Sequence, residues 1–189
     1  MRKFKIAVIV GSNRRESINR RLAQALAKLG AAKFDVVWAR IDDLPMYNQD
    51  LETPLPASVA RFKAEVEGAD GILIVTPEHS RSVPAVLKNA IDWGARPWGK
   101  NSWAGKTVAI TGTSPGAIGT AVAQQHLRHM FGVLGALVMG GEAYVTFKPD
   151  LLDAAGAITD DSTREFLRAF VDQFAGLLQR LHPTQRAAA

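Results

Sequence analysis

Short runs of apolar residues, many of them β-branched, recur along the chain and are separated by longer stretches of mixed polarity. The runs cover residues 5–10, 35–41, 71–75, 107–111 and 136–139. A continuous apolar run of this length is typical of a strand that is buried on both faces. The pattern therefore predicts one sheet built from these strands.

The stretches between the runs predict amphipathic helices, because their apolar residues fall on one face at helical spacing. Their apolar positions are Ile18, Leu22, Ala25, Leu26 and Leu29; Val59, Phe62 and Val66; Leu87, Ile91 and Ala95; Ile118, Val122, Leu127, Phe131 and Leu134; and Phe166, Phe170, Phe174, Leu177 and Leu181. Gly30 stands where the first helix needs a C-cap. Ser82 is expected to cap the third helix, and Pro84 to occupy its first turn. Residues 146–162 show no clear period and predict a surface excursion.

Strands that alternate with helices of this length predict a parallel sheet covered by helices on both faces. Together they fit an α/β flavodoxin-like three-layer sandwich, with a five-stranded parallel sheet in the order 2-1-3-4-5. The chain of 189 residues suffices for one sizeable core. We expect a single domain over residues 1–182 and a frayed tail over 183–189.

Composition narrows the class of protein. The chain has no cysteine, which excludes disulfides, thiol nucleophiles and thiolate metal sites and fits a cytoplasmic location. The apolar segment 6–10 is shorter than a signal-peptide core, and no segment approaches the ~20 apolar residues of a membrane span. The net charge of +5 is scattered along the chain, so we predict no nucleic-acid partner, no membrane partner and no metal.

The loop after the first strand has the composition of a phosphate site. Its sequence is GSNRRESIN, residues 11–19. The candidate ligands of a phosphate are Ser12, Arg14, Ser17 and Asn19, with Ile18 at the start of a helix whose free N–H groups attract anions. The loop matches neither G-x-x-x-x-G-K nor G-x-G-x-x-G. In the alternative interpretation Ser17 is only a helix N-cap, with Arg14 and Arg15 in solvent.

The loop after the third strand carries the most specific motif. Residues 76–97 read TPEHSRSVPAVLKNAIDWGARP. This stretch resembles the PEY-type flavin loop of the NAD(P)H-dependent FMN reductases, a family that includes quinone, chromate and azo-dye reductases. The resemblance is close from residue 77 to 93, and GSxR…SxN in the first loop is similar to the family's phosphate loop. It implies FMN as cofactor and NADPH or NADH as co-substrate.

The resemblance also implies which residues meet the flavin. Pro77, Glu78, His79 and Ser80 would present backbone groups to the edge of the ring, with Ser82 beside them. His79 and Ser80 depart from the family's Tyr and Asn; the first change keeps a planar side chain, and the second removes an amide. A catalytic role of His79 is an alternative, but hydride transfer needs no protein base, so we predict no catalytic side chain.

The loop after the fourth strand, GTSPGAIG, covers residues 112–119. Its glycines and proline suggest close backbone approach to a flat ligand. In the family this loop flanks the flavin and helps to form the acceptor pocket, so Ser114 and Gly116 join the predicted cofactor site.

These features predict an FMN-dependent NAD(P)H oxidoreductase with ping-pong turnover, passing electrons to quinones or similar acceptors such as azo dyes and chromate. One alternative is a flavodoxin-type electron carrier, although such carriers are usually acidic. Another is a reductase that releases reduced FMN to a monooxygenase. The sequence distinguishes neither NADH from NADPH nor the physiological acceptor.

The resemblance further implies a homodimer or homotetramer, with acceptor pockets at the subunit boundary; the alternative is a monomer. Charged contacts would come from Arg81, Arg128 and Glu142, since an Arg fork grips a carboxylate well in a partly dehydrated interface. Trp98, Trp103 and Tyr144 would supply the apolar part. If exposed, Trp98 and Trp103 would suit this interface or the rim of the acceptor pocket.

Overall fold

A computed structural model describes residues 3–182, so the predicted frayed tail lies outside the described residues. In chain order the elements are β1 (Phe4–Val10), α1 (Ile18–Leu29), β2 (Phe34–Trp38), the 3-10 turn η1 (Gln49–Leu51), α2 (Ala57–Glu67), β3 (Gly71–Val75), α3 (Ala85–Ala95), β4 (Thr107–Ser114), α4 (Ala121–Val133), β5 (Leu137–Val138), β6 (Tyr144–Thr146) and α5 (Asp161–Leu181). Each apolar run of the sequence contains a strand. Both ends of β3 match the prediction, and the ends of the other strands differ from it by at most three residues.

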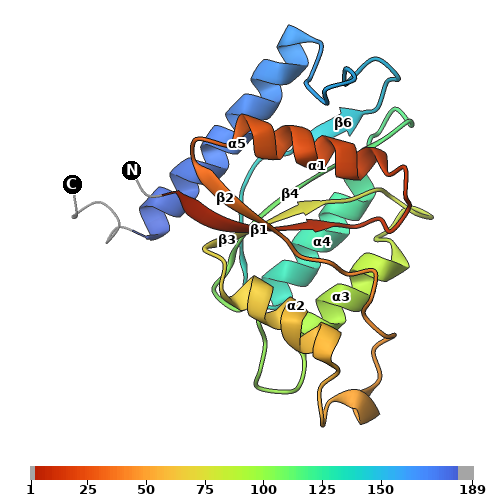
Figure 1. Ribbon diagram of the computed structural model, residues 1–189, viewed down its shortest axis with the longest axis vertical. Helices are drawn as coiled ribbons and strands as arrows, with labels where there is room; N and C mark the ends of the chain where they lie inside the picture. Colours follow the sequence, from red (N-terminus) through yellow and green to blue (C-terminus); the bar gives the residue numbers. More distant parts are fainter. Residues whose placement is uncertain (1–2, 183–189) are drawn as a thin grey trace.

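The strands form a parallel sheet in the order β2-β1-β3-β4-β5 (Figure 1). Val8 pairs with Leu73, and Leu73 pairs with Ala109, so the middle residues of the three central strands lie side by side across the sheet. The predicted order 2-1-3-4-5 and the flavodoxin-like sandwich are confirmed. From β1 the chain adds β2 on one side of the sheet, and it then adds β3, β4 and β5 on the other side. The position between β1 and β3 is the switch point of the sheet, where such sheets bind their ligands.

The fifth strand is divided into two pieces, which the sequence pattern did not reveal. β5 pairs with the beginning of β4, while β6 pairs in parallel with Gly112–Ser114 at its end. The Thr111 hydroxyl donates to Ala143 O and the Thr113 hydroxyl to Val145 O, both at 2.8 Å. These contacts extend β4 beyond its predicted end at residue 111, so the first residues of the predicted loop 112–119 belong to the sheet.

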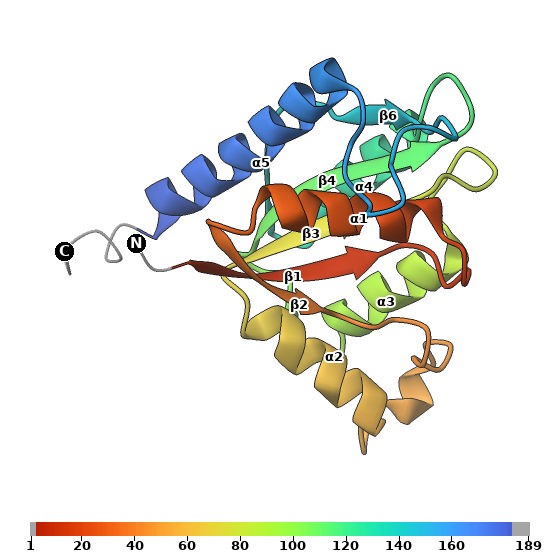
Figure 2. The ribbon, with the colours of Figure 1, turned by 45° about the horizontal axis from the view of Figure 1, so that its top comes forward.

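Helices cover both faces of the sheet, and each face has its own apolar core. α1 and α5 pack on one face, where Ile6 and Val8 point. α2, α3 and α4 pack on the other, where Ala7 and Ile9 point (Figure 2). Consecutive residues of β1 are thus buried on opposite faces, which is why the strand reads as an unbroken apolar run.

Two helical predictions need correction. Helix α4 begins at Ala121, so Ile118 lies outside it and is exposed. In α5 the stripe predicted from Phe166 to Leu181 is displaced, and both of those end residues are exposed. The buried residues are Leu167, Phe170, Val171, Phe174, Ala175 and Leu178. Apolar residues on neighbouring faces of α5 allow more than one stripe, and contact with the sheet selects among them.

Trp103 was expected at an exposed surface, and this prediction is wrong. Its side chain is 0% exposed, its ring centroid lies 5.2 Å from that of Phe131, and its indole N–H donates to Ile91 O. Trp98 is 88% exposed. Both lie in the connection from α3 to β4, at the edge of the sheet where β4 begins. They are therefore on the opposite edge from the loops after β1, β3 and β4.

The stretch 146–162 is mostly irregular, as predicted, yet it is anchored. Leu151, Leu152 and Ile158 are buried against the α1 and α5 face. An isolated antiparallel bridge joins Leu152 to Ile158. Within residues 3–182 no helix is both long enough and apolar enough to cross a membrane.

Candidate functional site

Three loops meet at the carboxyl edge of the sheet, at the right of Figure 2. They are residues 11–17 after β1, 76–84 after β3 and 115–120 after β4. Backbone hydrogen bonds between neighbouring strands continue into the first residue of each of the first two loops: Gly11 N donates to Val75 O, and Thr76 N donates to Thr111 O. The sequence-predicted site residues of all three loops are therefore brought to one edge.

Thr76 lies at the centre of this junction, and sequence reasoning did not select it. A Cβ on Gly11 would lie 2.6 Å from the Thr76 hydroxyl, and one on Gly112 would lie 1.9 Å from Thr76 O. Both distances are far below van der Waals contact, so only glycine allows the loops to approach this closely. In the sequence, this junction is indicated by Gly11, which follows β1, and by Gly112, near the end of β4.

The 11–17 loop presents several free donors. The Ser17 oxygen accepts the N–H of Arg20 at 3.2 Å and so caps α1, which leaves the Ser17 O–H to donate elsewhere. The Ser12 oxygen accepts the N–H of Arg14 at 3.4 Å. Within residues 3–182 the N–H groups of the loop residues 13, 15 and 16 donate to no protein acceptor. Free N–H groups beside hydroxyl groups, just before the start of a helix, are able to bind an anion.

Asn19 differs from the other predicted phosphate ligands because its amide is committed to the protein. Its side chain is 1% exposed, donates to Thr113 O and accepts from Thr113 N, both at 2.9 Å. The pair of hydrogen bonds fixes the start of α1 to the end of β4. Asn19 thus positions the 11–17 loop, and contact of its remaining N–H with a ligand stays a prediction.

The 76–84 loop contains a tight turn in an uncommon backbone conformation. His79 and Ser82 exchange two backbone hydrogen bonds, of 3.1 and 2.8 Å, around Ser80 and Arg81. These two residues have φ of 49° and 57°. Two successive positive φ values are typical of a type I′ turn, which favours Asn and Gly. The loop therefore carries local strain, which proteins often place at functional sites.

Ser82 does not cap α3, contrary to the prediction. The helix begins at Ala85, Pro84 is at the N-cap position, and the helix has no side-chain cap. The Ser82 hydroxyl lies 3.0 Å from Nδ1 of His126 on α4. The tight turn carries Ser82 toward α4, too early in the chain to reach the first N–H groups of α3.

Glu78 connects the second loop to the third. One carboxylate oxygen accepts the N–H groups of Val122 and Ala123 at 2.9 and 3.1 Å, and the other accepts Arg81 Nη1 at 2.8 Å. Burial by itself raises the pKa of Glu78 and is the largest single influence. The hydrogen bonds from Arg81, Ala123 and Val122 together outweigh it, so the pKa lies below its usual range. The carboxylate is therefore charged at neutral pH.

The third loop gives Ser114 and Gly116 different surroundings. The Ser114 hydroxyl donates to Gly119 O at 2.5 Å and closes the loop on itself. Gly116 is exposed, and a Cβ there would make only an ordinary contact. The close backbone approach expected from the glycines of this loop is found at Gly112, where the neighbour is protein. A role of Gly116 at a ligand stays a prediction.

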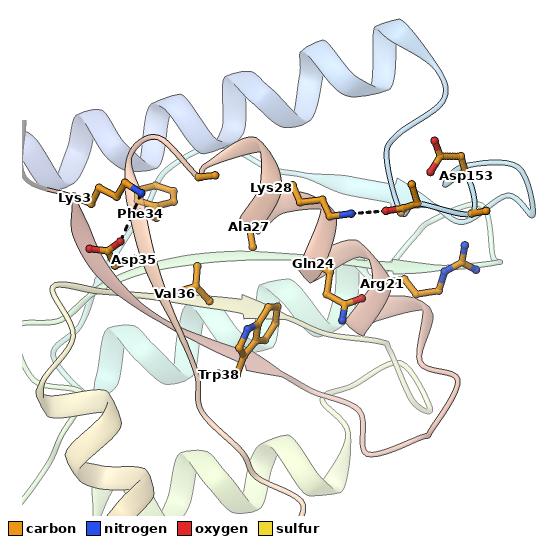
Figure 3. A pocket seen from close by; sticks show the side chains of 14 residues that line it. Lys3, Arg21, Gln24, Ala27, Lys28, Phe34, Asp35, Val36, Trp38 and Asp153 are labelled. Atoms are coloured by element: carbon orange, nitrogen blue, oxygen red, sulfur yellow. Dashed lines mark hydrogen bonds and ion pairs between the residues drawn. The ribbon is translucent and has the colours of Figure 1, made fainter.

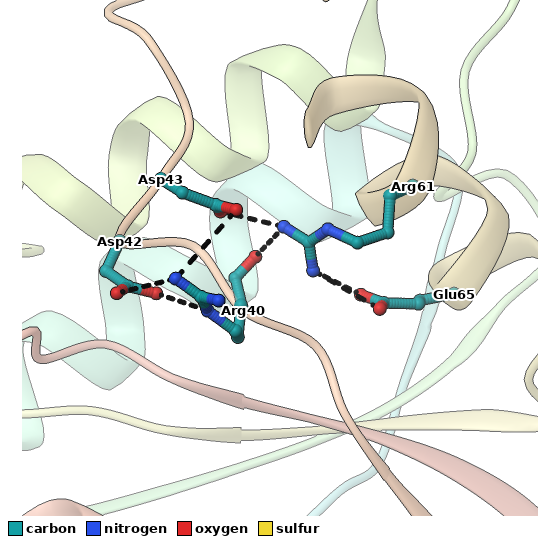
Figure 4. A network of polar contacts seen from close by, with 5 residues as sticks. All are labelled: Arg40, Asp42, Asp43, Arg61 and Glu65. Carbon is teal, nitrogen blue, oxygen red and sulfur yellow. Dashed lines mark hydrogen bonds and ion pairs between the residues drawn. The ribbon is translucent and has the colours of Figure 1, made fainter. Parts of the chain in front are cut away.

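A polar network holds the long connection after β2 beside this edge (Figure 4). Arg61 on α2 binds Asp43 at 2.7 Å and Glu65 at 3.1 Å, and donates to Arg40 O. Arg40 in turn pairs with Asp42, whose pKa is lowered mainly by that hydrogen bond. Exposed ion pairs contribute little stability individually. Their effect here is to fix the course of the connection, which adjoins Ser12 across a small cavity of about 30 Å³.

The residues expected at a subunit interface lie on two separate parts of the chain. Arg128 on α4 donates to Met139 O and Gly141 O, and Gln125 donates to both Glu142 and the Tyr144 hydroxyl. These contacts brace the segment between β5 and β6. Arg81 instead pairs with Glu78 in the second loop. Their contacts with another subunit stay a prediction.

A larger open groove of about 870 Å³ lies away from the three loops (Figure 3). It runs between α1 and the edge strand β2, with Val36 and Trp38 on its floor. Lys28 crosses it to donate to Ala155 O, and Lys3 pairs with Asp35. It contains none of the predicted site residues. The described residues also form no cluster of three or more His, Asp and Glu side chains that would hold a metal.

The sheet order, the helices on both faces and the loops gathered at the reversal point define a flavodoxin-like α/β protein with its candidate site at the switch point. The sequence model of the family described as NADPH-dependent FMN reductase matches residues 4–150. The chain belongs to this family.

Individual relatives agree over nearly the whole chain. A 2-hydroxy-1,4-benzoquinone reductase from a Burkholderia species is 48% identical, over 91% of this chain and 94% of the relative. A quinone reductase from Escherichia coli K12 is 35% identical, over 95% and 97%. The solved structure of FerB, a flavoenzyme NAD(P)H:(acceptor) oxidoreductase from Paracoccus denitrificans, superposes with a TM-score of 0.91 at 43% identity, covering 94% and 98%.

Proposed function

We propose that this protein is an FMN-dependent NAD(P)H oxidoreductase that reduces quinones. The observation that carries the proposal is the meeting of the 11–17 and 76–84 loops at the switch point of the sheet, in a chain of the FMN reductase family. The Burkholderia and Escherichia coli relatives, both named as quinone-compound reductases, support the acceptor class. Bound FMN would supply a centre that takes hydride from a nicotinamide and passes two electrons on.

The residues present fit this cofactor. The Ser12 and Ser17 hydroxyls, the Arg14 guanidinium and the free N–H groups at the start of α1 would hold the phosphate. The backbone of residues 77–80, with Ser82 nearby, would face the edge of the ring. Ser114 and Gly116 would flank it from the third loop. No side chain is assigned a proton transfer, so His79 is proposed to supply only a flat surface.

The phosphate site can be tested with two ligands that differ only by the phosphate. Replacing Ser12 and Ser17 together with Ala should weaken FMN binding by a few kcal/mol, since each hydrogen bond to a charged group contributes roughly 1.5–3 kcal/mol. Riboflavin binding should change little, because it has no phosphate. Calorimetric titration of the apoprotein measures both affinities.

A second variant separates the phosphate contact from the helix cap. Ser17→Asp keeps a capping oxygen but places a negative charge against the phosphate, so it should abolish FMN binding without destabilising the apoprotein. Equal loss of riboflavin and FMN affinity in the double Ala variant would place the phosphate elsewhere. FAD as the flavin released from the purified protein, identified by mass spectrometry, would contradict the cofactor assignment.

The reaction is proposed to be ping-pong, with nicotinamide and acceptor occupying one site in turn. Initial rates with a benzoquinone should then give parallel double-reciprocal lines, whereas intersecting lines would show that both bind together. Azo dyes and chromate are proposed as further acceptors and need separate assays. Quinone reduction without any added reductase would exclude a simple electron carrier, and FMN retained through gel filtration would argue against release to a monooxygenase.

We further propose that the active form is a homodimer or homotetramer with its acceptor pocket at the subunit boundary. Arg81, Arg128 and Glu142 are the charged residues proposed for that boundary. A cytoplasmic location also stays a prediction of the sequence.

A further inference from the structure

Helix α4 has no capping group of its own. Thr120 stands at the N-cap position, but its hydroxyl caps no backbone N–H of the helix and instead accepts Gln124 Nε2 at 3.0 Å. The first N–H groups of a helix need acceptors when water does not reach them. The acceptor for Val122 and Ala123 is Glu78, which belongs to a loop distant in sequence.

This arrangement joins two of the three loops at the candidate site. Only Thr76 and Pro77 separate Glu78 from β3, and Val122 is the second residue of α4, which begins where the 115–120 loop ends. The Glu78 side chain is only 5% exposed, so the carboxylate is enclosed between the two loops. Its third hydrogen bond, from Arg81, reaches across the tight turn of its own loop and orients the carboxylate.

We propose that the side chain of Glu78 is a positioning residue that sets the separation of the 76–84 and 115–120 loops, and thereby the width of the slot for the flavin ring. The carboxylate accepts three hydrogen bonds from protein donors and its side chain is enclosed, so Glu78 would meet the ring only through its backbone. The inference rests on the proposed function for the identity of the ligand. The loop-to-helix clamp itself is independent of that ligand.

The length of the Glu78 side chain, more than its charge, sets the separation of the two loops. A glutamine has the same length and offers one oxygen to the two helix N–H groups, while Arg81 has a 70% exposed side chain that water can solvate. An aspartate keeps the charge but is one methylene shorter. An alanine has no acceptor at all.

The experiment compares Glu78→Ala, Glu78→Asp and Glu78→Gln by FMN titration and by hydrogen exchange of the apoprotein. E78A should weaken FMN binding by at least about tenfold, the order expected when a charged hydrogen-bonding group is lost. E78D should resemble E78A, and E78Q should recover most of the affinity. In the apoproteins of E78A and E78D, amides in both loops should exchange faster together.

Asp160→Ala is the matched control, because it removes the N-cap of another helix, α5, outside the three loops. It should lower the Tm of the apoprotein and leave FMN affinity unchanged. Wild-type affinity in E78A, or equal loss of affinity in D160A, would overturn the inference. If E78D binds FMN like the wild type and E78Q does not, then the charge of residue 78 sets the loop separation and the length of its side chain does not. Failure of the wild type to bind FMN would defeat the proposed function, while the exchange data would still decide the clamp.

Discussion

The two tryptophans of the α3–β4 connection show how differently one residue type behaves in one loop. Trp103 lies over Gly94, where an added Cβ would meet its ring at 2.4 Å, and its ring packs edge-on against Phe62 and Phe131. Trp98, in the same connection, is almost fully exposed. Loop composition alone does not separate the two, because burial here depends on Gly94 and on helices that the loop reaches only in the folded chain.

Trp103→Ala is accordingly expected to reduce the free energy of unfolding by about 3–5 kcal/mol, as is usual for a fully buried large aromatic. Trp98→Ala should change it by less than about 0.5 kcal/mol, as at most surface positions. Urea denaturation followed by circular dichroism measures both. Similar losses in the two variants would contradict the assigned burial.

Gly112 and Gly132 form a second contrasting pair. Gly112→Ala would press a Cβ onto Thr76 O, so we expect at least about 2 kcal/mol of destabilisation, in the range of overpacked cores, and weaker FMN binding. A Cβ at Gly132, on α4, meets nothing within 4 Å. Gly132→Ala should therefore be neutral or stabilise by up to about 1 kcal/mol, through helix propensity. A tolerated Ala at 112 would mean that the strand-end junction is looser than described.

At the scale of elements, α5 depends on a capping group of its own. Asp160 accepts the N–H of Thr163 at 2.7 Å and the hydroxyl of Ser162 at 2.6 Å. The hydrogen bonds from Ser162 and Thr163 lower the pKa of Asp160 from 3.8 to about 2. The folded state therefore binds this proton less readily than the unfolded state does.

The sign of the pH dependence follows from this difference. Asp160 contributes stability above about pH 3.8, and this contribution is lost as the pH falls toward about 2. Asp160→Asn keeps an oxygen cap but does not titrate, so its stability should fall less steeply over that interval. Tm recorded as a function of pH for both proteins tests this. Parallel curves would assign the acid sensitivity to other carboxylates.

The divided fifth strand is the element that sequence patterns fail to reveal. The apolar run 136–139 indicates β5, which has two residues, but β6 has only three residues, too few for a period to indicate it. β6 is placed by the hydroxyls of Thr111 and Thr113, which bind the 143–145 backbone from the neighbouring strand. Those hydrogen bonds exist only when β4 and this segment are side by side.

At the scale of the whole molecule, the proposed assembly is tested by mass. Light scattering at micromolar concentration should give a value well above the 20.4 kDa of one chain. Glu142→Ala should weaken the oligomer or reduce quinone turnover, because Glu142 is proposed to meet an Arg of the neighbouring subunit. Gln173→Ala, which removes a contact to Gly140 O from α5, serves as a nearby control.

A mass of one chain would refute the assembly. An intact oligomer with unchanged turnover in Glu142→Ala would refute only that contact.

The sequence by itself determined the order of the strands, the helices between them and the edge where the candidate site lies. These features follow from local properties: apolar runs such as 71–75 are buried on both faces, and parallel strands bring their following loops to one edge. The sequence also marked the glycine at position 11 and the resemblance of residues 77–93 to a flavin loop.

The roles of several side chains were decided by tertiary structure alone. The Asn19 amide is hydrogen-bonded to Thr113, and Glu78 caps α4. The Ser82 hydroxyl is hydrogen-bonded to His126 and does not cap α3. Each partner is more than forty positions away in sequence. A hydrogen bond is short-ranged and directional, so its partner is fixed only when folding has brought distant backbone groups within about 3 Å.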